Sequence, residues 1–191
     1  MSASTKKDRL LRLMISAIMI ALAQVLPLLI GDVQVMNQGI SPMHIPAFVA
    51  GLTCGPLWGA LVGFVSPLLR SAFFGMPPFP VTAVPMAFEL AVYGAVTGLC
   101  YTLLRRRSPK KNHLPMIYIA LVAAMLLGRC VGGVAKLAVM GLQGNPYTFS
   151  AFIAAYFTGT WVGAVINLVL VPAVVTALEK AKLSPLDREL K

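Results

Sequence analysis

The chain has 191 residues, of which 58% are hydrophobic and 12% are charged, whereas a soluble domain usually carries about a quarter charged residues. The formal net charge is +10, but the basic residues stand at the ends of apolar runs, a pattern that orients membrane proteins and does not call for a nucleic-acid partner. The composition therefore excludes a soluble protein and predicts an all-α integral membrane protein surrounded by membrane lipid.

Apolar runs and their interruptions predict six transmembrane helices in a single membrane domain over residues 1–191. A bilayer core of about 30 Å takes about 20 apolar residues per helix. The pair Gly55-Pro56 predicts a break between the second and third helices, because proline removes a backbone donor and clashes with the preceding turn. The second helix is short for a span, so we expect it to be tilted or buried among its neighbours. In chain order, the expected helices cover about residues 10–30, 42–54, 56–74, 84–105, 114–141 and 149–179.

Basic residues indicate how the spans are oriented. Thirteen of the sixteen Lys and Arg lie in three segments, which are the N-terminus, the loop after the fourth helix and the C-terminus. Six spans place all three segments on one side, and the positive-inside rule makes that side the cytoplasm. We therefore expect both termini in the cytoplasm. The expected outer loops contain no Lys or Arg and cover residues 31–41, 75–83 and 142–148.

The other three basic residues and one acidic residue lie in the interior of the expected spans: Arg70, Glu89, Arg129 and Lys136. Intramembrane charge is costly, so it usually faces the bundle interior and marks a pathway or site. At a rise of 1.5 Å per residue, Arg70 and Glu89 both fall about 6–7 Å below the outer ends of consecutive helices. Their similar depth predicts an ion pair that joins these helices, and this pairing does not exclude contact with a ligand.

Arg129 and Lys136 are seven residues apart, so they share one face of the fifth expected helix. Glu89 is the only acidic residue in the interior of the expected spans, and we assign it to Arg70. Arg129 and Lys136 therefore form a basic stripe, which we expect to meet an anionic group on a ligand. For Lys136 the alternative is snorkelling to the outer surface.

Further candidate residues for substrate binding lie near the outer loops. They include Trp161, for which a core position is the alternative, whereas Asn167 is expected to join helices rather than contact a ligand. The remaining candidates are Gln38, His44, Asn145 and Tyr147.

Glycine pairs four residues apart allow close contact between helices and predict ordinary bundle packing. They are Gly59/Gly63, Gly94/Gly98, Gly128/Gly132 and Gly159/Gly163.

Motifs for catalysis are missing from the sequence. It contains no G-x-x-x-x-G-K-[ST] phosphate loop, no H-E-x-x-H, no G-x-S-x-G and no acidic metal cluster, so we expect neither ATP hydrolysis nor another enzymatic activity. We also expect no cofactor and no bound metal.

Residues 43–99 read "MHIPAFVAGLTCGPLWGALVGFVSPLLRSAFFGMPPFPVTAVPMAFELAVYGAVTGL". This stretch resembles the substrate-binding S components of energy-coupling factor (ECF) vitamin transporters, which are multi-pass proteins of the prokaryotic plasma membrane. The resemblance is carried by the proline-rich loop and by the preceding pattern Pro46/Gly51/Gly55-Pro56/Gly59/Gly63. The expected six-span layout and the basic cytoplasmic segments agree with it.

The resemblance implies that the chain binds a micronutrient from outside and docks on a membrane scaffold protein that carries two cytoplasmic ATPase subunits. The docking motif of the family is alanine-x-x-x-alanine in the first helix, which Ala17 and Ala21 match. The first two outer loops would act as gates. Within the family, the basic stripe favours pantothenate as cargo, and folate-like, pyridoxine-like or purine-like cargo are alternatives.

Three other functions compete with this interpretation. A stand-alone ion-coupled importer would use Glu89 as a proton relay and would transport without an ATPase partner. A structural membrane subunit would bind no ligand through Arg129 or Lys136. An integral-membrane enzyme has the least support, because the six acidic residues lie mostly at the ends of the chain.

Overall fold

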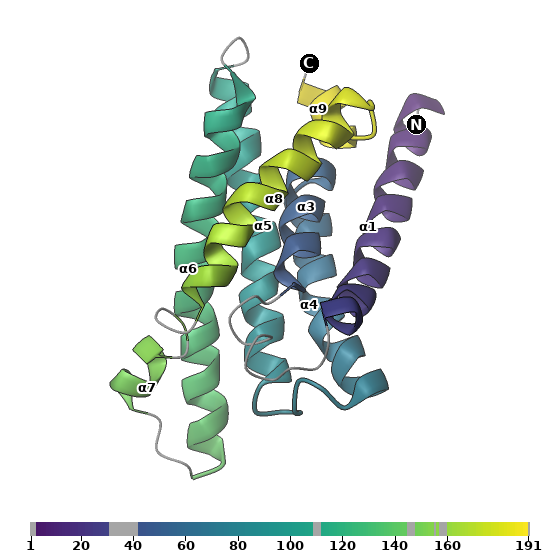
Figure 1. Cartoon of the computed structure of the whole chain (residues 1–191). Coiled ribbons are helices and arrows are strands. Elements are labelled where there is room, and N and C mark those ends of the chain that lie inside the picture. The colour runs from purple at the N-terminus through teal and green to yellow at the C-terminus, as the bar shows by residue number, and fades with distance from the viewer. Residues whose placement is uncertain are drawn as a thin grey trace.

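The computed structural model describes residues 3–30, 42–108, 112–144, 148–154, 156 and 160–190. Within these ranges every regular element is helical, and five helices are long and apolar enough to cross a membrane. This confirms the all-α membrane class. With the labels of Figure 1, the helices are α1 (Ala3–Ile30), α3 (His44–Cys54), α4 (Pro56–Phe74), α5 (Ala83–Arg107), α6 (His113–Leu142), α7 (Phe149–Ile153), α8 (Trp161–Lys180) and α9 (Pro185–Leu190).

The short helix α3 lies in the centre of the bundle, in contact with α1, α4, α5, α8 and α9 (Figure 1). Its 11 residues span only about 16 Å, and all residues from Pro46 to Cys54 are buried. The helix is therefore enclosed by its neighbours, as expected from its length. It ends at the predicted break, where Gly55 adopts φ 100° and ψ 173°, a conformation that only glycine adopts without strain.

Glycine contacts hold α3, α4 and α5 at backbone distance. A Cβ atom added to Gly94 of α5 would lie 2.1 Å from the carbonyl oxygen of Gly59 in α4, and one added to Gly51 of α3 would lie 2.3 Å from the carbonyl oxygen of Gly94. Further along α4, a Cβ on Gly63 would lie 2.1 Å from the carbonyl oxygen of Leu90. These three helices therefore form a tightly packed unit on which the other helices are arranged.

The expected single helix over residues 149–179 is wrong, because two separate helices, α7 and α8, occupy this range. Thr160, with φ −117° and ψ 9°, is the non-helical residue before α8. Thr160 is β-branched and a weak helix former, which agrees with a start at Trp161. Figure 1 shows α7 beside the part of α6 that lies away from the chain termini, and Phe152 of α7 packs against Gly133 of α6.

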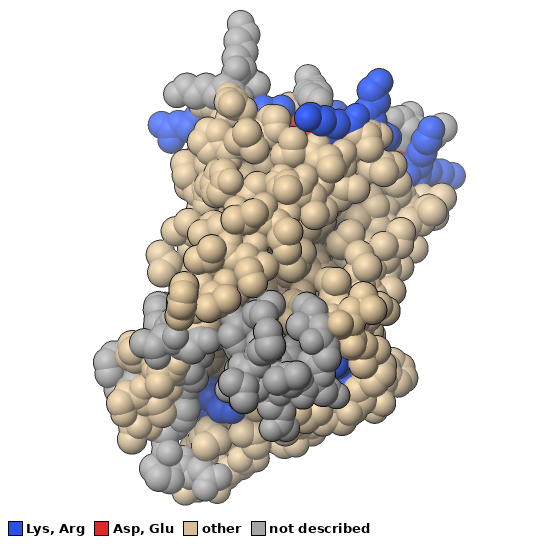
Figure 2. All heavy atoms as spheres, in the orientation of Figure 1, with Lys and Arg blue, Asp and Glu red and all other residues tan. Residues whose placement is uncertain are grey.

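A short C-terminal helix, α9, was not expected from the sequence, and it ties several helices together at the end of the bundle that holds both termini. Asp187 of α9 is buried and accepts a hydrogen bond from Arg105 of α5 at 3.3 Å. Arg12 of α1 forms an ion pair with Glu189 and donates to the carbonyl oxygen of Cys54 at 3.0 Å. Basic side chains also gather at this end, which we call the basic end (Figure 2). Those that are exposed include Lys6, Lys7, Arg9, Arg106, Arg107, Lys180, Lys182 and Arg188.

We expect the Arg12→Met variant to unfold more easily than the wild type, by about 1–2 kcal/mol, because it loses one hydrogen bond and one partly exposed ion pair. Thermal melting of the purified protein in detergent measures this change. Arg9→Met is the matched control, because Arg9 lies on the same helix and is exposed, without a hydrogen bond or ion pair in the described part of the chain. Equal melting temperatures for the two variants would contradict a structural role of Arg12.

Candidate functional site

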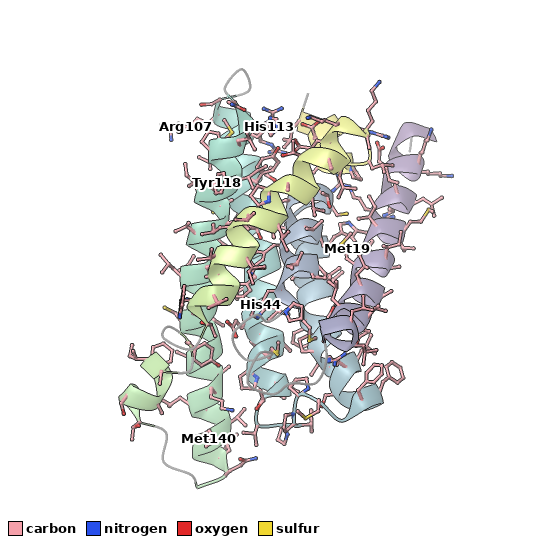
Figure 3. All side chains as sticks on the ribbon, in the orientation of Figure 1. Met19, His44, Arg107, His113, Tyr118 and Met140 are labelled. Atoms are coloured by element: carbon pink, nitrogen blue, oxygen red, sulfur yellow. The ribbon has the colours of Figure 1, made fainter. Side chains whose placement is uncertain are left out.

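A small cavity opens between α3, α5, α6 and α8 at the middle of the bundle. Its volume is about 20 Å³, enough for one or two water molecules. Each of the four helices contributes two residues four positions apart, which therefore share one helix face: His44 and Phe48, Glu89 and Tyr93, Met125 and Arg129, and Gly163 and Asn167. Thr160 and Ala164 complete the lining. Figure 3 shows the labelled His44 well inside the bundle.

Glu89 and Tyr93 form the wall on α5. The hydroxyl of Tyr93 donates a hydrogen bond of 2.5 Å to Oε1 of Glu89, and both side chains are buried. Two glycines of α6 make room for them, since a Cβ on Gly128 would lie 2.3 Å from the ring of Tyr93 and one on Gly132 would lie 2.9 Å from Cβ of Glu89. The predicted glycine pair of α6 thus brings α6 against the acidic wall of the cavity.

Arg129 forms the basic part of the wall on α6. Its Nη2 lies 3.5 Å from the carbonyl oxygen of Thr160, which is the residue before α8. Glu89 and Tyr93 line the same cavity as this guanidinium. The cavity therefore contains one acidic and one basic side chain of opposite formal charge. Opposite charges interact strongly in a setting of low dielectric.

Aromatic rings close the cavity on the side of α3. Phe48 stacks on Tyr93 with 4.8 Å between ring centroids and 21° between planes, and His44 meets the edge of Tyr93 at 5.2 Å and 85°. His44 is the first residue of the short helix α3, so the central position of this helix places the imidazole at mid-bundle. The site therefore combines aromatic faces with hydrogen-bonding groups, as in many small-molecule sites.

The predicted ion pair between Arg70 and Glu89 is wrong. Arg70 Nη1 donates to the backbone oxygen of Gln24 at 2.9 Å, and its guanidinium lies 5.2 Å from the centre of the Phe74 ring. Gln24 Nε2 in turn donates to the carbonyl oxygen of Ser66 at 3.1 Å, so this group joins α1 to α4. Similar depth was not sufficient for pairing, because Arg70 faces α1 whereas Glu89 faces α6.

Lys136 is also placed differently from the expected basic stripe. Its Nζ donates to the carbonyl oxygen of Val81 at 2.8 Å and to the hydroxyl of Thr82 at 3.3 Å. Lys136 does not line the cavity. Its hydrogen bonds hold the segment before α5 against α6. The predicted anionic ligand depends on two basic residues, and the cavity contains one of them together with Glu89.

Loss of this tether should loosen the connection between α4 and α5. In the Lys136→Met variant we expect amide hydrogens of residues 76–82 to exchange about tenfold faster, because two hydrogen bonds are removed. Hydrogen–deuterium exchange followed by mass spectrometry measures this rate. Thr82→Val removes only the longer bond and should have a smaller effect. Unchanged exchange in Lys136→Met would show that the lysine does not hold this segment.

Of the other candidate residues, Trp161 is described by the structure and does not line the cavity. Trp161, the first residue of α8, is 64% exposed, because the helix begins there and turns the indole outward. Gln38, Asn145 and Tyr147 lie outside the described residues. Ala17 and Ala21 are both exposed on α1, where the surrounding apolar side chains are exposed as well, among them Met14, Ile18 and Leu22.

Several cavity residues were not recognised from the sequence. Tyr93 and Phe48 are aromatic residues inside apolar runs, and no motif sets them apart from other core residues. Asn167 was expected to join helices. A usable signal was the spacing of Thr160, Gly163 and Asn167, which lie on one helix face. In the described part of the chain, no cluster of three or more His, Cys, Asp or Glu side chains is arranged to bind a metal ion.

Comparison with known families gives one match. Residues 11–175 match the family model described as "ECF transporter, substrate-specific component". No curated protein sequence and no solved structure matches the chain.

Proposed function

Since the chain belongs to the substrate-specific components of ECF transporters, we propose that its central cavity captures a water-soluble vitamin or vitamin precursor. In this proposal the cargo comes from outside the cell and is handed to an ATP-driven transport module. The observation that carries the proposal is the enclosed set of Glu89, Arg129, His44 and Asn167 at the centre of an apolar helix bundle. Buried polar groups of this density in a membrane protein usually serve a substrate.

The proposed topology has six spans, with α3 as a short buried span and both termini in the cytoplasm. Its support is the distribution of charge, because exposed basic residues gather at the basic end and such residues favour the cytoplasmic side. The segment that Lys136 holds lies at the other end of α5. Cargo would then reach the cavity from the end opposite the basic end.

Pantothenate is the first cargo to test, with folate-like, pyridoxine-like and purine-like molecules as alternatives. Arg129 supports a polar cargo, but Glu89 in the same cavity opposes a strongly anionic one. The small volume of about 20 Å³ means that the cavity must widen to admit any of these molecules. A binding-linked rearrangement is therefore part of the proposal.

Docking on a transmembrane scaffold with two ATPase subunits is proposed through α1. Ala17 and Ala21 leave a shallow strip on the exposed side of this helix, and small residues allow another helix to approach closely. Both alanines are exposed, and α1 contributes no residue to the cavity lining. Binding of cargo and docking would therefore use different sides of the protein.

The test begins with mass spectrometry of small molecules released from the gently solubilised protein, followed by thermal-shift measurements with the vitamins named above. Binding of at least one of them, with no accumulation in vesicles that contain this chain alone, is the expected result. Accumulation in such vesicles under an ion gradient would instead support the stand-alone importer. Absence of any bound or shifting compound would contradict the proposed cargo.

A further inference from the structure

Asn167 of α8 presents a buried polar group that lacks a hydrogen-bond partner. The side chain is 3% exposed and lines the cavity, and its Oδ1 accepts no hydrogen bond in the described part of the chain. Buried side-chain amides in native proteins are nearly always hydrogen-bonded. An amide that joined two helices, as the sequence suggested, would have a partner on the neighbouring helix.

The residues around Asn167 do not satisfy this oxygen. Gly163 and Ala164 lie one turn away on its own helix, and Met125 and Phe48 contribute apolar surface across the cavity. The hydroxyl of Tyr93 is already donated to Glu89 at 2.5 Å. Arg129 and His44 also line the cavity, and in the described part of the chain neither donates to Oδ1. A molecule that enters the cavity can therefore supply the missing donor.

The charges around the cavity limit what that molecule presents. Glu89 and Arg129 both line the cavity, and their formal charges cancel, so the group that enters needs no net charge. A carboxylate only accepts hydrogen bonds, so it would leave Oδ1 of Asn167 without a donor and would lie near Glu89. A hydroxyl or a carboxamide supplies a donor for Oδ1 and an acceptor for Nδ2 of the same side chain.

We propose that Asn167 determines specificity by binding the buried end of the cargo, and that this end is an uncharged group with an O–H or N–H donor. The inference rests on the proposed function, and it names the chemistry of the group that meets Asn167. A cargo that also carries a carboxylate places that group away from Asn167.

The first experiment needs no cargo. Asn167→Leu replaces the amide with an apolar side chain of similar size, so the melting temperature of the cargo-free protein should rise by about 2–4 °C, because a buried, poorly satisfied polar group is removed. Thr176→Val is the control on the same helix, because Thr176 donates only to the backbone oxygen of Pro172 at 2.7 Å. A lower melting temperature for Asn167→Leu would show that Asn167 joins helices and would overturn the inference.

The second experiment measures binding with pantothenate and pyridoxine as probes, both of which carry hydroxyl groups. In Asn167→Leu, the affinity for any probe that binds the wild type should fall at least about tenfold, because the buried hydroxyl loses its partner. Thr176→Val should bind like the wild type. Wild-type affinity in Asn167→Leu would overturn the inference, because it would show that Asn167 does not bind the cargo.

The failure of the inference can be distinguished from the failure of the proposed function. A wild-type protein that binds neither probe contradicts the cargo proposed above. The cargo-free melting comparison then decides the role of Asn167 by itself, since a rise supports an amide that is exposed to the cavity and a fall supports a structural amide.

Discussion

The Gly94→Ala variant should lose at least about 3 kcal/mol of its free energy of unfolding, a cost at the upper end of what overpacking usually produces. A Cβ atom on Gly94 would lie 2.1 Å from the carbonyl oxygen and 2.2 Å from the carbonyl carbon of Gly59. Both contacts are with backbone atoms, so no change of rotamer relieves them. Helices α4 and α5 would have to separate, which also moves Glu89 and Tyr93 away from the cavity. Thermal melting in detergent and the yield of folded protein measure this loss.

Gly141→Ala is the matched control for this variant. Gly141 lies near the end of α6, where an added Cβ would meet no atom within 4 Å. Alanine favours the helix more than glycine does by up to about 1 kcal/mol, so this variant should melt at the same temperature as the wild type or slightly higher. A Gly94→Ala variant as stable as Gly141→Ala would contradict the close packing of α4 and α5.

The Arg129→Met variant should be destabilised by about 3 kcal/mol, because Arg129 and Glu89 line the same small cavity and loss of one partner leaves the other charge buried. The double variant Arg129→Met/Glu89→Gln should recover at least about 1 kcal/mol relative to the sum of the two single changes, as is typical of residues that interact. Melting temperatures of the four proteins give the coupling energy. The affinity for cargo should fall in both single variants, because each removes a polar group from the cavity wall.

A second double-mutant cycle, with Arg70→Met and Glu89→Gln, is the control. Arg70 binds the backbone of Gln24 and lies against Phe74, so its effect should add to that of Glu89→Gln within about 0.5 kcal/mol. Strong coupling in this cycle and additivity in the first would contradict the arrangement of charges described above and would favour the pairing suggested by depth alone.

The positions of the long helices follow from local properties of the sequence. Three features indicate these positions: apolar runs near 20 residues, the Gly55-Pro56 break and the three basic segments. Each depends only on residues that are neighbours in the chain. The bilayer thickness sets the length of a run, and proline ends a helix through its own backbone geometry. The start of α8 is the exception. There the weak helix former Thr160 stands next to a long apolar run, so the apolar pattern did not indicate where the helix begins.

The candidate site was predictable only in part. Glu89, Arg129 and His44 were recognised because a polar side chain in an apolar run is conspicuous, and all three line the cavity. Lys136 and Arg70 were equally conspicuous, yet each is bound to backbone atoms elsewhere. Depth along a helix follows from counting residues, whereas the direction of a side chain depends on how the helix is rotated against its neighbours.

By itself, the sequence determined the membrane class, the approximate extent of the long helices and the rarity of charge inside them. Only the tertiary structure decided which charges meet, because glycines such as Gly59, Gly94 and Gly128 set the rotation and separation of α4, α5 and α6. These contacts join residues far apart in the chain. The partners of Glu89, and the buried amide of Asn167 at the cavity, are consequences of that packing.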